Sequence, residues 1–299
     1  MQNNILIVGF GSIGSRHVKI LSNKISNKNL FILTKKKIKK FNTINNLKEA
    51  IDINPKFIII SNPTNVHLEY LKFFEKNFKN KYILVEKPLF NKFTKAKFVN
   101  NKILVAYNLR QHSIVNYLKD KISNKNLFNI TIKCKSYLPN WRKGNYEKYY
   151  SSNKHLGGGV LLDLSHEFDY LSYIFGKFRI THSVIKKISK LKIDCEDYAY
   201  IYGKLVNGIF FSIELNYFSR FSERNIILDY KDYSIDADLI KNKISYSGLK
   251  NKIINFPINE IDNTYTRQIH KFLNKEFNNF CSYESGLNIN LIIDKIKKL

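Results

Sequence analysis

The sequence has little cysteine and no long apolar run, and each shortage excludes a class of protein. It contains three cysteines, Cys134, Cys195 and Cys281, which are odd in number and far apart. This spacing fits neither a disulfide framework nor a zinc site, so we expect no bound metal. No apolar run approaches the roughly 18 residues that a membrane-spanning helix needs, and the chain enters a predicted strand without a signal-peptide pattern. We therefore expect a cytoplasmic protein without a transmembrane segment.

Acidic residues are scarce as well. The chain has 24 Asp and Glu against 50 Lys and Arg, which gives a formal net charge of +26. Such a charge could indicate a nucleic-acid binder, a surface that attracts anionic membranes, or a field that steers anionic substrates. The lysines, however, are spread along the whole chain and mixed with Asn, Ile, Phe and Tyr, which is typical of a bias towards A+T-rich codons. We therefore expect no specific nucleic-acid partner.

The apolar content is high enough for two folded domains. Hydrophobic residues make up 44% of the 299 positions, so the chain can bury proper cores. Short apolar runs alternate with helical patterns through residues 1–110: strands are predicted at 4–8, 29–33, 57–60, 82–85 and 103–106, and helices at 15–21, 43–52, 66–78 and 93–100. This alternation predicts an α/β fold, a doubly wound parallel sheet of the Rossmann type, over residues 1–112.

The pattern changes after residue 112. Strands are predicted at 127–137, 180–189, 197–206, 209–218, 224–230 and 242–246, and helices at 113–122, 160–171, 264–280 and 284–298. Asn207-Gly208 is a strong hairpin turn between two of these strands. Residues 113–299 are therefore predicted to form an α+β domain with a mostly antiparallel open sheet, which would bind the substrate and form an oligomer.

The strongest single motif is a glycine turn near the N-terminus. Gly9-Phe10-Gly11-Ser12-Ile13-Gly14 lies between a predicted strand and a predicted helix, and this context gives the pattern its meaning. Gly9 allows a tight turn, Gly11 lets the backbone approach a pyrophosphate, and Gly14 lets helix and strand pack closely. The motif predicts a dinucleotide cofactor held at the start of the helix. The alternative is an ordinary glycine turn without a ligand.

The form of the cofactor is indicated by a missing acidic residue. An acid after the second strand usually holds the ribose 2′-hydroxyl of NAD, but no Asp or Glu occurs between residues 1 and 48. Thr34-Lys35-Lys36-Lys37 stands there instead, and a hydroxyl with three lysines suits a 2′-phosphate. We therefore expect NADP rather than NAD. The alternative is that these lysines only reflect the general excess of lysine.

Further motifs follow in a fixed order. They are Asn62-Pro63-Thr64-Asn65-Val66-His67, Glu86-Lys87-Pro88, Tyr107-Asn108-Leu109-Arg110, and Gly157-Gly158-Gly159 through Asp169. Together with the glycine turn and the Ser15-Arg16-His17 that follows it, their order and spacing resemble the Gfo/Idh/MocA oxidoreductase family along the length of the chain. The stretch Leu138-Pro139-Asn140-Trp141-Arg142 and the segment after Gly159 look most like the subgroup associated with surface-polysaccharide and sialic-acid-like sugar pathways.

The resemblance implies an NAD(P)-dependent dehydrogenase or reductase that acts on CH–OH groups of a sugar, sugar nucleotide or polyol. Lys87 would be the catalytic lysine beside the nicotinamide, with a cis bond to Pro88, which proline tolerates at small cost. His166 would exchange a proton with the sugar hydroxyl, and histidine titrates near neutrality when unperturbed. Asp163 would orient that histidine or bind the substrate. Many members space the acid and the histidine four residues apart. Here they are three apart, which still places them on one face of a helix.

The remaining residues are expected to line the two binding sites. The cofactor would be bound by Gly9, Phe10, Gly11, Ser12, Ile13, Gly14, Thr34, Lys35, Asn62, Pro63, Thr64, His67, Glu86, Lys87 and Asn108. The substrate would be bound by Lys87, Arg110, Trp141, Arg142, Tyr146, Asp163 and His166, with Arg142 suited to a phosphate or carboxylate.

The resemblance also implies a homodimer or homotetramer formed through the open sheet. Two other functions stay open, namely a nucleotide-binding sensor or scaffold without catalysis and an NAD-dependent glycoside hydrolase of the same fold.

Overall fold

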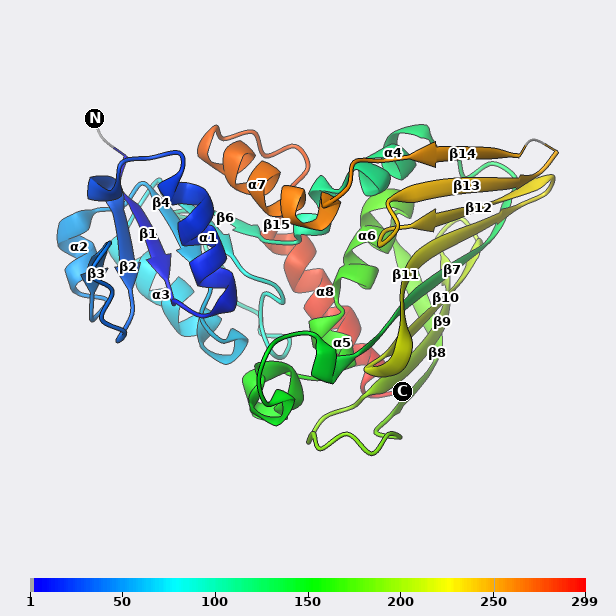
Figure 1. Ribbon diagram of the computed structural model, residues 1–299, viewed down its shortest axis with the longest axis horizontal. Helices are drawn as coiled ribbons and strands as arrows, with labels where there is room; N and C mark the ends of the chain where they lie inside the picture. The colour runs from blue at the N-terminus through cyan, green and yellow to red at the C-terminus, as the bar shows by residue number, and fades with distance from the viewer. Residues whose placement is uncertain (1–2, 250) are drawn as a thin grey trace. The chain divides into compact units, whose positions relative to one another are not determined.

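The computed structural model describes residues 3–249 and 251–299, which form two compact units (Figure 1). The first unit extends to Asn108 and also includes Tyr265–Asn290, and the second consists of Leu109–Thr264 and Leu291–Leu299. The first crossing between the units lies between Asn108 and Leu109, whereas the sequence was divided between residues 112 and 113. The predicted division does not include the later return of the chain, which nothing in the local sequence pattern signals.

A seven-stranded sheet forms the centre of the first unit. Its strand order is β15-β6-β5-β4-β1-β2-β3, and every neighbouring pair is parallel except β15 with β6. The order reverses between β4 and β1, which is where open α/β sheets bind their ligands. The strands are β1 (Ile5–Val8), β2 (Leu30–Leu33), β3 (Asn42–Ile44), β4 (Phe57–Ile60), β5 (Tyr82–Val85), β6 (Lys102–Val105) and β15 (Cys281–Ser282).

Helices cover this sheet, which is why its strands are continuous apolar runs rather than alternating ones. The helices with residues in the first unit are α1 (Ser12–Ser22), α2 (Glu49–Ile53), α3 (His67–Asn77), α7 (Glu260–Leu273) and α8 (Tyr283–Ile296). Short 3₁₀ helices of the chain as a whole lie at Asn27–Asn29, Thr64–Val66, Asn108–Gln111, Leu138–Asn140, Tyr146–Lys148, Tyr150–Ser152 and Lys154–Leu156.

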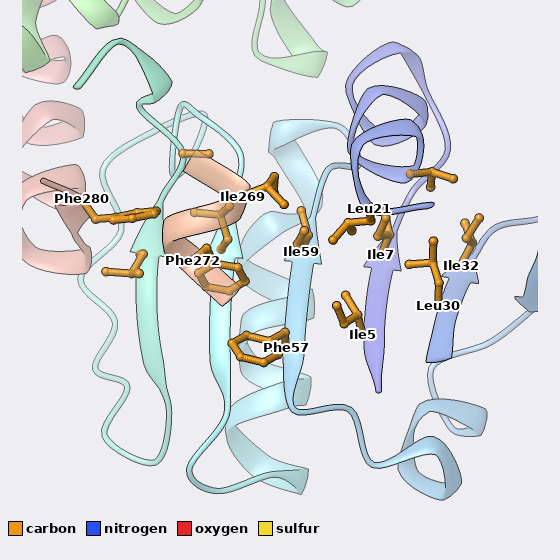
Figure 2. Packing of buried hydrophobic residues seen from close by; sticks show 14 residues of the cluster. Ile5, Ile7, Leu21, Leu30, Ile32, Phe57, Ile59, Ile269, Phe272 and Phe280 are labelled. Atoms are coloured by element: carbon orange, nitrogen blue, oxygen red, sulfur yellow. The ribbon is translucent and has the colours of Figure 1, made fainter. Parts of the chain in front are cut away.

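The core of the first unit combines residues from both ends of the sequence. Figure 2 shows Ile7 and Ile59 of the central strands together with residues that follow position 265. The Phe272 ring of α7 meets the Phe57 ring of β4 edge-on, with 5.4 Å between their centroids. Ile269 and Phe280 belong to the same buried cluster. The returning chain is therefore part of the hydrophobic core and not an appendage.

An eight-stranded sheet forms the second unit. Its order is β14-β13-β12-β11-β7-β10-β9-β8, and among the strands described only β7 and β10 pair in parallel. Helices lie on one side of the sheet (Figure 1). Its elements are β7 (Leu127–Tyr137), β8 (Phe178–Lys186), β9 (Tyr198–Leu205), β10 (Phe210–Asn216), β11 (Phe218–Tyr230), β12 (Tyr233–Asp238), β13 (Lys243–Gly248), β14 (Lys252–Asn255), α4 (Ser113–Lys121), α5 (Val160–Asp163) and α6 (His166–Phe175).

Several elements differ from the sequence prediction. Residues 93–100, expected to be a helix, have no regular secondary structure. Side chains from elsewhere bind their backbone: Glu75 accepts a hydrogen bond from the amide of Asn100 (2.8 Å), and Tyr283 donates to the carbonyl of Ala96 (2.9 Å). The helix expected at 43–52 is divided between β3 and α2, and strands β12 and β14 were not predicted. No helix in the described part of the chain is long and apolar enough to cross a bilayer.

Candidate functional site

Residues that follow three neighbouring strands lie along one edge of the parallel sheet. The glycine turn begins at the carboxyl end of β1, next to Ser61, whose amide donates to the carbonyl of Val8 (2.8 Å). Glu86 follows β5, and its amide likewise donates to the last residue of the neighbouring strand, at the carbonyl of Ile60 (2.8 Å). The turn after β1 and the Glu-Lys-Pro segment after β5 therefore stand at the edge where ligands bind in this class of sheet.

Two glycines of the turn have different surroundings. Gly14 is buried in α1, and a Cβ there would lie 2.8 Å from the Ser61 hydroxyl, so helix and strand pack closely only without a side chain. Gly11 is exposed at the N-cap of α1, and a Cβ there would have no described atom within 4 Å. The first amides of a helix have no partner inside the helix, and α1 has no acidic residue in its first turn. These residues fit the pyrophosphate of a dinucleotide.

The lysine run after β2 reaches the same turn. The Lys36 ammonium donates to the carbonyl of Phe10 (3.2 Å), and the Lys36 amide donates to the Thr34 hydroxyl (3.1 Å). Lys35 and Lys37 are exposed on either side of it. The residue of this run that contacts the turn is thus Lys36, one position beyond the predicted Lys35.

His67 is buried and contacts backbone on both sides of its ring. Its Nδ1 lies 3.1 Å from the carbonyl oxygen of Leu89, and its Nε2 lies 3.0 Å from that of Asn62. Burial lowers the pKa of this imidazole, against the opposing effect of the carbonyl contacts. His67 therefore joins the segment after β4 to the segment after β5. Of the other residues predicted there, Pro63 is exposed and Thr64 is buried.

The Glu86-Lys87-Pro88 segment has the cis bond between Lys87 and Pro88 that the resemblance implies. Lys87 is half-buried, and Asn108 is buried after the end of β6. The Glu86 carboxylate accepts a hydrogen bond from Nε2 of His17, at 2.7 Å. His17 ends the stretch Gly9–His17 that resembles the family, but no role as a site residue was predicted for it.

The predicted pair in the second unit lies on two helices and not on one. Asp163 is the last residue of α5, and His166 is the first residue of α6. Leu164 leaves the helical conformation between them, with φ −95° and ψ 34°. The expectation that the pair occupies one face of a continuous helix is therefore wrong. Both side chains are nonetheless buried.

Two tyrosines hold the Asp163 carboxylate. The Tyr150 hydroxyl donates to Oδ1, and the Tyr217 hydroxyl donates to Oδ2 (3.2 Å). Burial, followed by the charge of Asp163, raises the pKa of both phenols well above the usual range. The Trp141 ring packs edge-on against Tyr217 (5.2 Å between centroids), and the Arg142 guanidinium lies over the Tyr150 ring (5.5 Å). The predicted residues Trp141 and Arg142 are thus connected to Asp163 through tyrosines that the sequence did not single out.

The triple glycine, Gly157-Gly158-Gly159, packs the start of α5 closely against the backbone of residues 150–153. A Cβ at Gly158 would lie 2.6 Å from the carbonyl oxygen of Ser151, and a Cβ at Gly159 would lie 2.7 Å from Oε2 of Glu196. Gly159 also has a φ of +104°, which side chains disfavour. The motif therefore provides close packing of the segment that carries Asp163.

Two further predicted residues have structural contacts. Arg110 is buried in the second unit, where its Nε and Nη2 bind the two carboxylate oxygens of Asp169 (2.9 and 2.8 Å) and its guanidinium lies over the Tyr173 ring (4.6 Å). The Tyr146 hydroxyl accepts a hydrogen bond from the amide of Lys192 (3.1 Å). Both side chains thus hold protein segments together. Among the described residues, no group of His, Cys, Asp and Glu is suited to hold a metal ion.

Comparisons with known proteins agree with this arrangement. Residues 119–297, more than half of the chain, match the model of the oxidoreductase family Gfo/Idh/MocA, C-terminal alpha/beta domain. The chain is 29% identical over 238 residues to glucose-6-phosphate 3-dehydrogenase of Bacillus subtilis (strain 168), covering 71% of this chain and 67% of that protein.

Solved structures show the same fold. Levoglucosan dehydrogenase in complex with NADH superposes with a TM-score of 0.82 at 17% identity, covering 100% of this chain and 96% of that one. The WlbA dehydrogenase of Bordetella pertussis, in complex with NADH and UDP-GlcNAcA, gives a TM-score of 0.75 at 13% identity, with 100% and 96% coverage. The Rossmann-like first sheet, the mostly antiparallel second sheet and the family match lead to one conclusion: the chain belongs to the Gfo/Idh/MocA family of oxidoreductases.

Proposed function

We propose that this protein is an NAD(P)-dependent dehydrogenase that oxidises a secondary alcohol of a sugar, sugar nucleotide or polyol to a ketone, and that it also catalyses the reverse reduction. One observation carries the proposal. The open, acid-free start of α1 at Gly11 lies on the same sheet edge as Glu86-Lys87-Pro88. A dinucleotide bound at the helix start would have its reactive end near a lysine on that edge.

The reaction removes a hydride from carbon and a proton from oxygen. The bound nicotinamide supplies the hydride acceptor. We assign the proton to Lys87 and His166, because an amine or imidazole positioned at the hydroxyl can accept it during oxidation and return it during reduction. We assign to Asp163 the orientation of the substrate or of His166. Its two oxygens are held by Tyr150 and Tyr217, which fixes the carboxylate in one position.

Purified variants test these assignments. Lys87→Ala and His166→Ala are each expected to lower kcat by about 10²- to 10⁴-fold, the range of general acid–base catalysis. Asp163→Asn keeps the shape of this side chain and removes its charge, so its kcat shows how much the charge of Asp163 contributes. Activity within about tenfold of wild type for His166→Ala would remove it as the main proton carrier.

For the cofactor we propose NADP. Lys36 is fixed beside the glycine turn by its bond to the Phe10 carbonyl (3.2 Å), so its charge is available to a 2′-phosphate. Titration with NADPH and NADH, followed by nicotinamide fluorescence, is the test. Lys36→Ala is expected to weaken NADPH binding by about tenfold and NADH binding little, whereas the exposed Lys39→Ala should change neither. Equal or tighter binding of NADH by wild type would refute the preference.

For the substrate we propose a phosphorylated or nucleotide-linked sugar of the kind that surface-polysaccharide pathways use. Arg142, stacked on Tyr150 beside Asp163, supports this because a guanidinium binds phosphates and carboxylates. The test is a panel of glucose, glucose 6-phosphate and UDP-N-acetylglucosamine with either oxidised cofactor. Tight cofactor binding without any turnover would favour a sensor or scaffold. Glycoside cleavage without net change of the cofactor would favour a hydrolase.

We also propose that the second unit forms a homodimer or homotetramer through the outer face of its sheet. Tyr200 and Phe210 are exposed there, and the Tyr202 and Phe210 rings stack with 5.8 Å between centroids. Exposed aromatic patches of this kind mark interfaces. Light scattering after size exclusion should show more than one chain per particle, and Phe210→Glu should reduce the assembly. A monomer in the wild type would refute the proposal.

A further inference from the structure

The segment that carries Lys87 is fixed on its downstream side by two buried side chains. Nδ1 of His67 lies 3.1 Å from the Leu89 carbonyl oxygen. The amide of Asn290 brackets Phe90, accepting from its N–H at 3.1 Å and donating to its carbonyl at 2.6 Å. The chain directly after Pro88 is therefore held by α3 and α8.

On the upstream side, the Glu86 amide donates to the Ile60 carbonyl (2.8 Å), and a side chain of α1 binds the Glu86 carboxylate. His17 is 0% exposed and Glu86 is 9% exposed, and the His17 Nε2 lies 2.7 Å from Glu86 Oε1. The Nδ1 of His17 is buried without a hydrogen-bond partner among the described residues. A proton on Nε2 satisfies the carboxylate, whereas a proton on Nδ1 would be a buried donor with no acceptor. The contact is therefore a directional N–H to carboxylate bond.

The contact between His17 and Glu86 links the helix that follows the glycine turn to the Glu-Lys-Pro segment after β5. His17 is in α1, which has Gly11 as its N-cap and contains Gly14, and Glu86 is the residue directly before Lys87. We propose that His17 is a positioning residue, which places Lys87 by holding the Glu86 carboxylate. The inference rests on the proposed catalytic role of Lys87. Without the imidazole, the Glu86 carboxylate loses this donor, and the residue before Lys87 loses its side-chain link to α1.

Three variants of His17 separate positioning from a general effect on stability. Glutamine can place an amide nitrogen where Nε2 stands, and asparagine is too short to reach Glu86, so the two form a matched pair of buried amides. His17→Leu removes the bond altogether. The measurements are kcat, KM, cofactor affinity by fluorescence, and amide hydrogen exchange of the peptide that spans Glu86–Phe90, all on the full chain.

We expect His17→Leu and His17→Asn to lower kcat by about tenfold to 10²-fold, because a displacement of about 1 Å costs that much. Cofactor affinity should stay within about twofold, since the glycine turn is intact. Exchange should become at least about tenfold faster in the Glu86–Phe90 peptide and not in peptides of β1 or β4. His17→Gln should restore most of the rate and the slow exchange.

Each other outcome overturns the inference. Unchanged exchange at Glu86–Phe90 in His17→Leu and His17→Asn would show that the segment needs no anchor from α1. Equal loss in the Gln and Asn variants would show that only the imidazole volume matters. Lys87→Ala in the same series separates this inference from the proposed function. If Lys87→Ala is inactive while His17→Asn is fully active, only the proposed role of His17 is refuted. If Lys87→Ala is active, the proposed catalytic role of Lys87 is refuted.

Discussion

The buried ion pair next to His166 allows a quantitative test of the second unit. Glu167 is 0% exposed in the first turn of α6, and its Oε1 accepts from the Nε of Arg224 in β11 at 2.8 Å. The Arg224 side chain is only 19% exposed. Removing one member of such a pair leaves a buried charge without compensation, which costs about 3–5 kcal/mol. The pair also fixes the residue that directly follows His166 in the chain.

The expected cost depends on whether one member or both are removed. Arg224→Met leaves the Glu167 carboxylate in the core, so we expect a loss of about 3 kcal/mol in the free energy of unfolding, near the lower end because water reaches the partly exposed guanidinium position. Glu167→Leu leaves the partly exposed Arg224 guanidinium without its carboxylate and should also lose about 3 kcal/mol. The double variant Glu167→Leu with Arg224→Met removes both charges and should lie within about 2 kcal/mol of wild type.

The single tryptophan makes the assay specific for this unit. Trp141 packs against Tyr217 in the second unit, so its fluorescence in urea follows that unit. The reasoning is refuted if the double variant is destabilised by the sum of the two single losses, because that would show no coupling between the side chains. Lys135→Met, which removes an ion pair with Glu223 on the other side of the sheet, is a partly exposed comparison and should cost less than about 1 kcal/mol.

Three further predictions concern the glycine turn, a histidine and the cysteines. Gly11→Ala should leave stability within about 0.5 kcal/mol yet weaken cofactor binding, whereas Gly14→Ala should destabilise the first unit by about 1–3 kcal/mol through overpacking, and thermal melts with fluorescence titrations distinguish the two. The lowered pKa of His67 means that this side chain binds a proton more readily in the unfolded chain than in the folded one, so its contribution to stability is complete above pH 6.5 and declines below it. Through His67, the free energy of unfolding should fall by at most about 1.4 kcal/mol per pH unit there. A dependence on pH that His67→Gln does not reduce would contradict this. Burial raises the pKa of Cys134, and raises that of Cys195 to about 12. A thiol reagent at mildly alkaline pH should therefore label these two cysteines slowly in the native chain and completely in the urea-unfolded chain. Fast labelling of either cysteine in the native chain would contradict the raised pKa values.

The parts of the molecule that local patterns specify were predictable. The apolar runs of β1, β4 and β5 predicted a parallel sheet because strands buried on both faces need no alternation. The glycine turn could be placed after β1 because it directly follows an apolar run and precedes a helical pattern, and both are local features of the sequence.

The parts that depend on distant residues were not predictable from one sequence. Tyr217 reaches Asp163 across 54 positions, and His17 reaches Glu86 across 69 positions. Neither residue type is unusual at its place in the chain. The separation of α5 from α6 was missed because residues 160–171 keep an apolar spacing through the break. Since Asp163 and His166 end and begin separate helices, the spacing of three residues places no helical constraint on their directions.

The composition of the first core has a consequence for biosynthesis. Ile269, Phe272 and Phe280 pack against strands that were made long before them, since β1 begins at Ile5. A nascent chain therefore carries a parallel sheet whose apolar surface stays partly uncovered until residues 265–280 leave the ribosome. Exposed surface of this kind binds chaperones or other nascent chains. Termination before Tyr265 would leave this part of the first core permanently open.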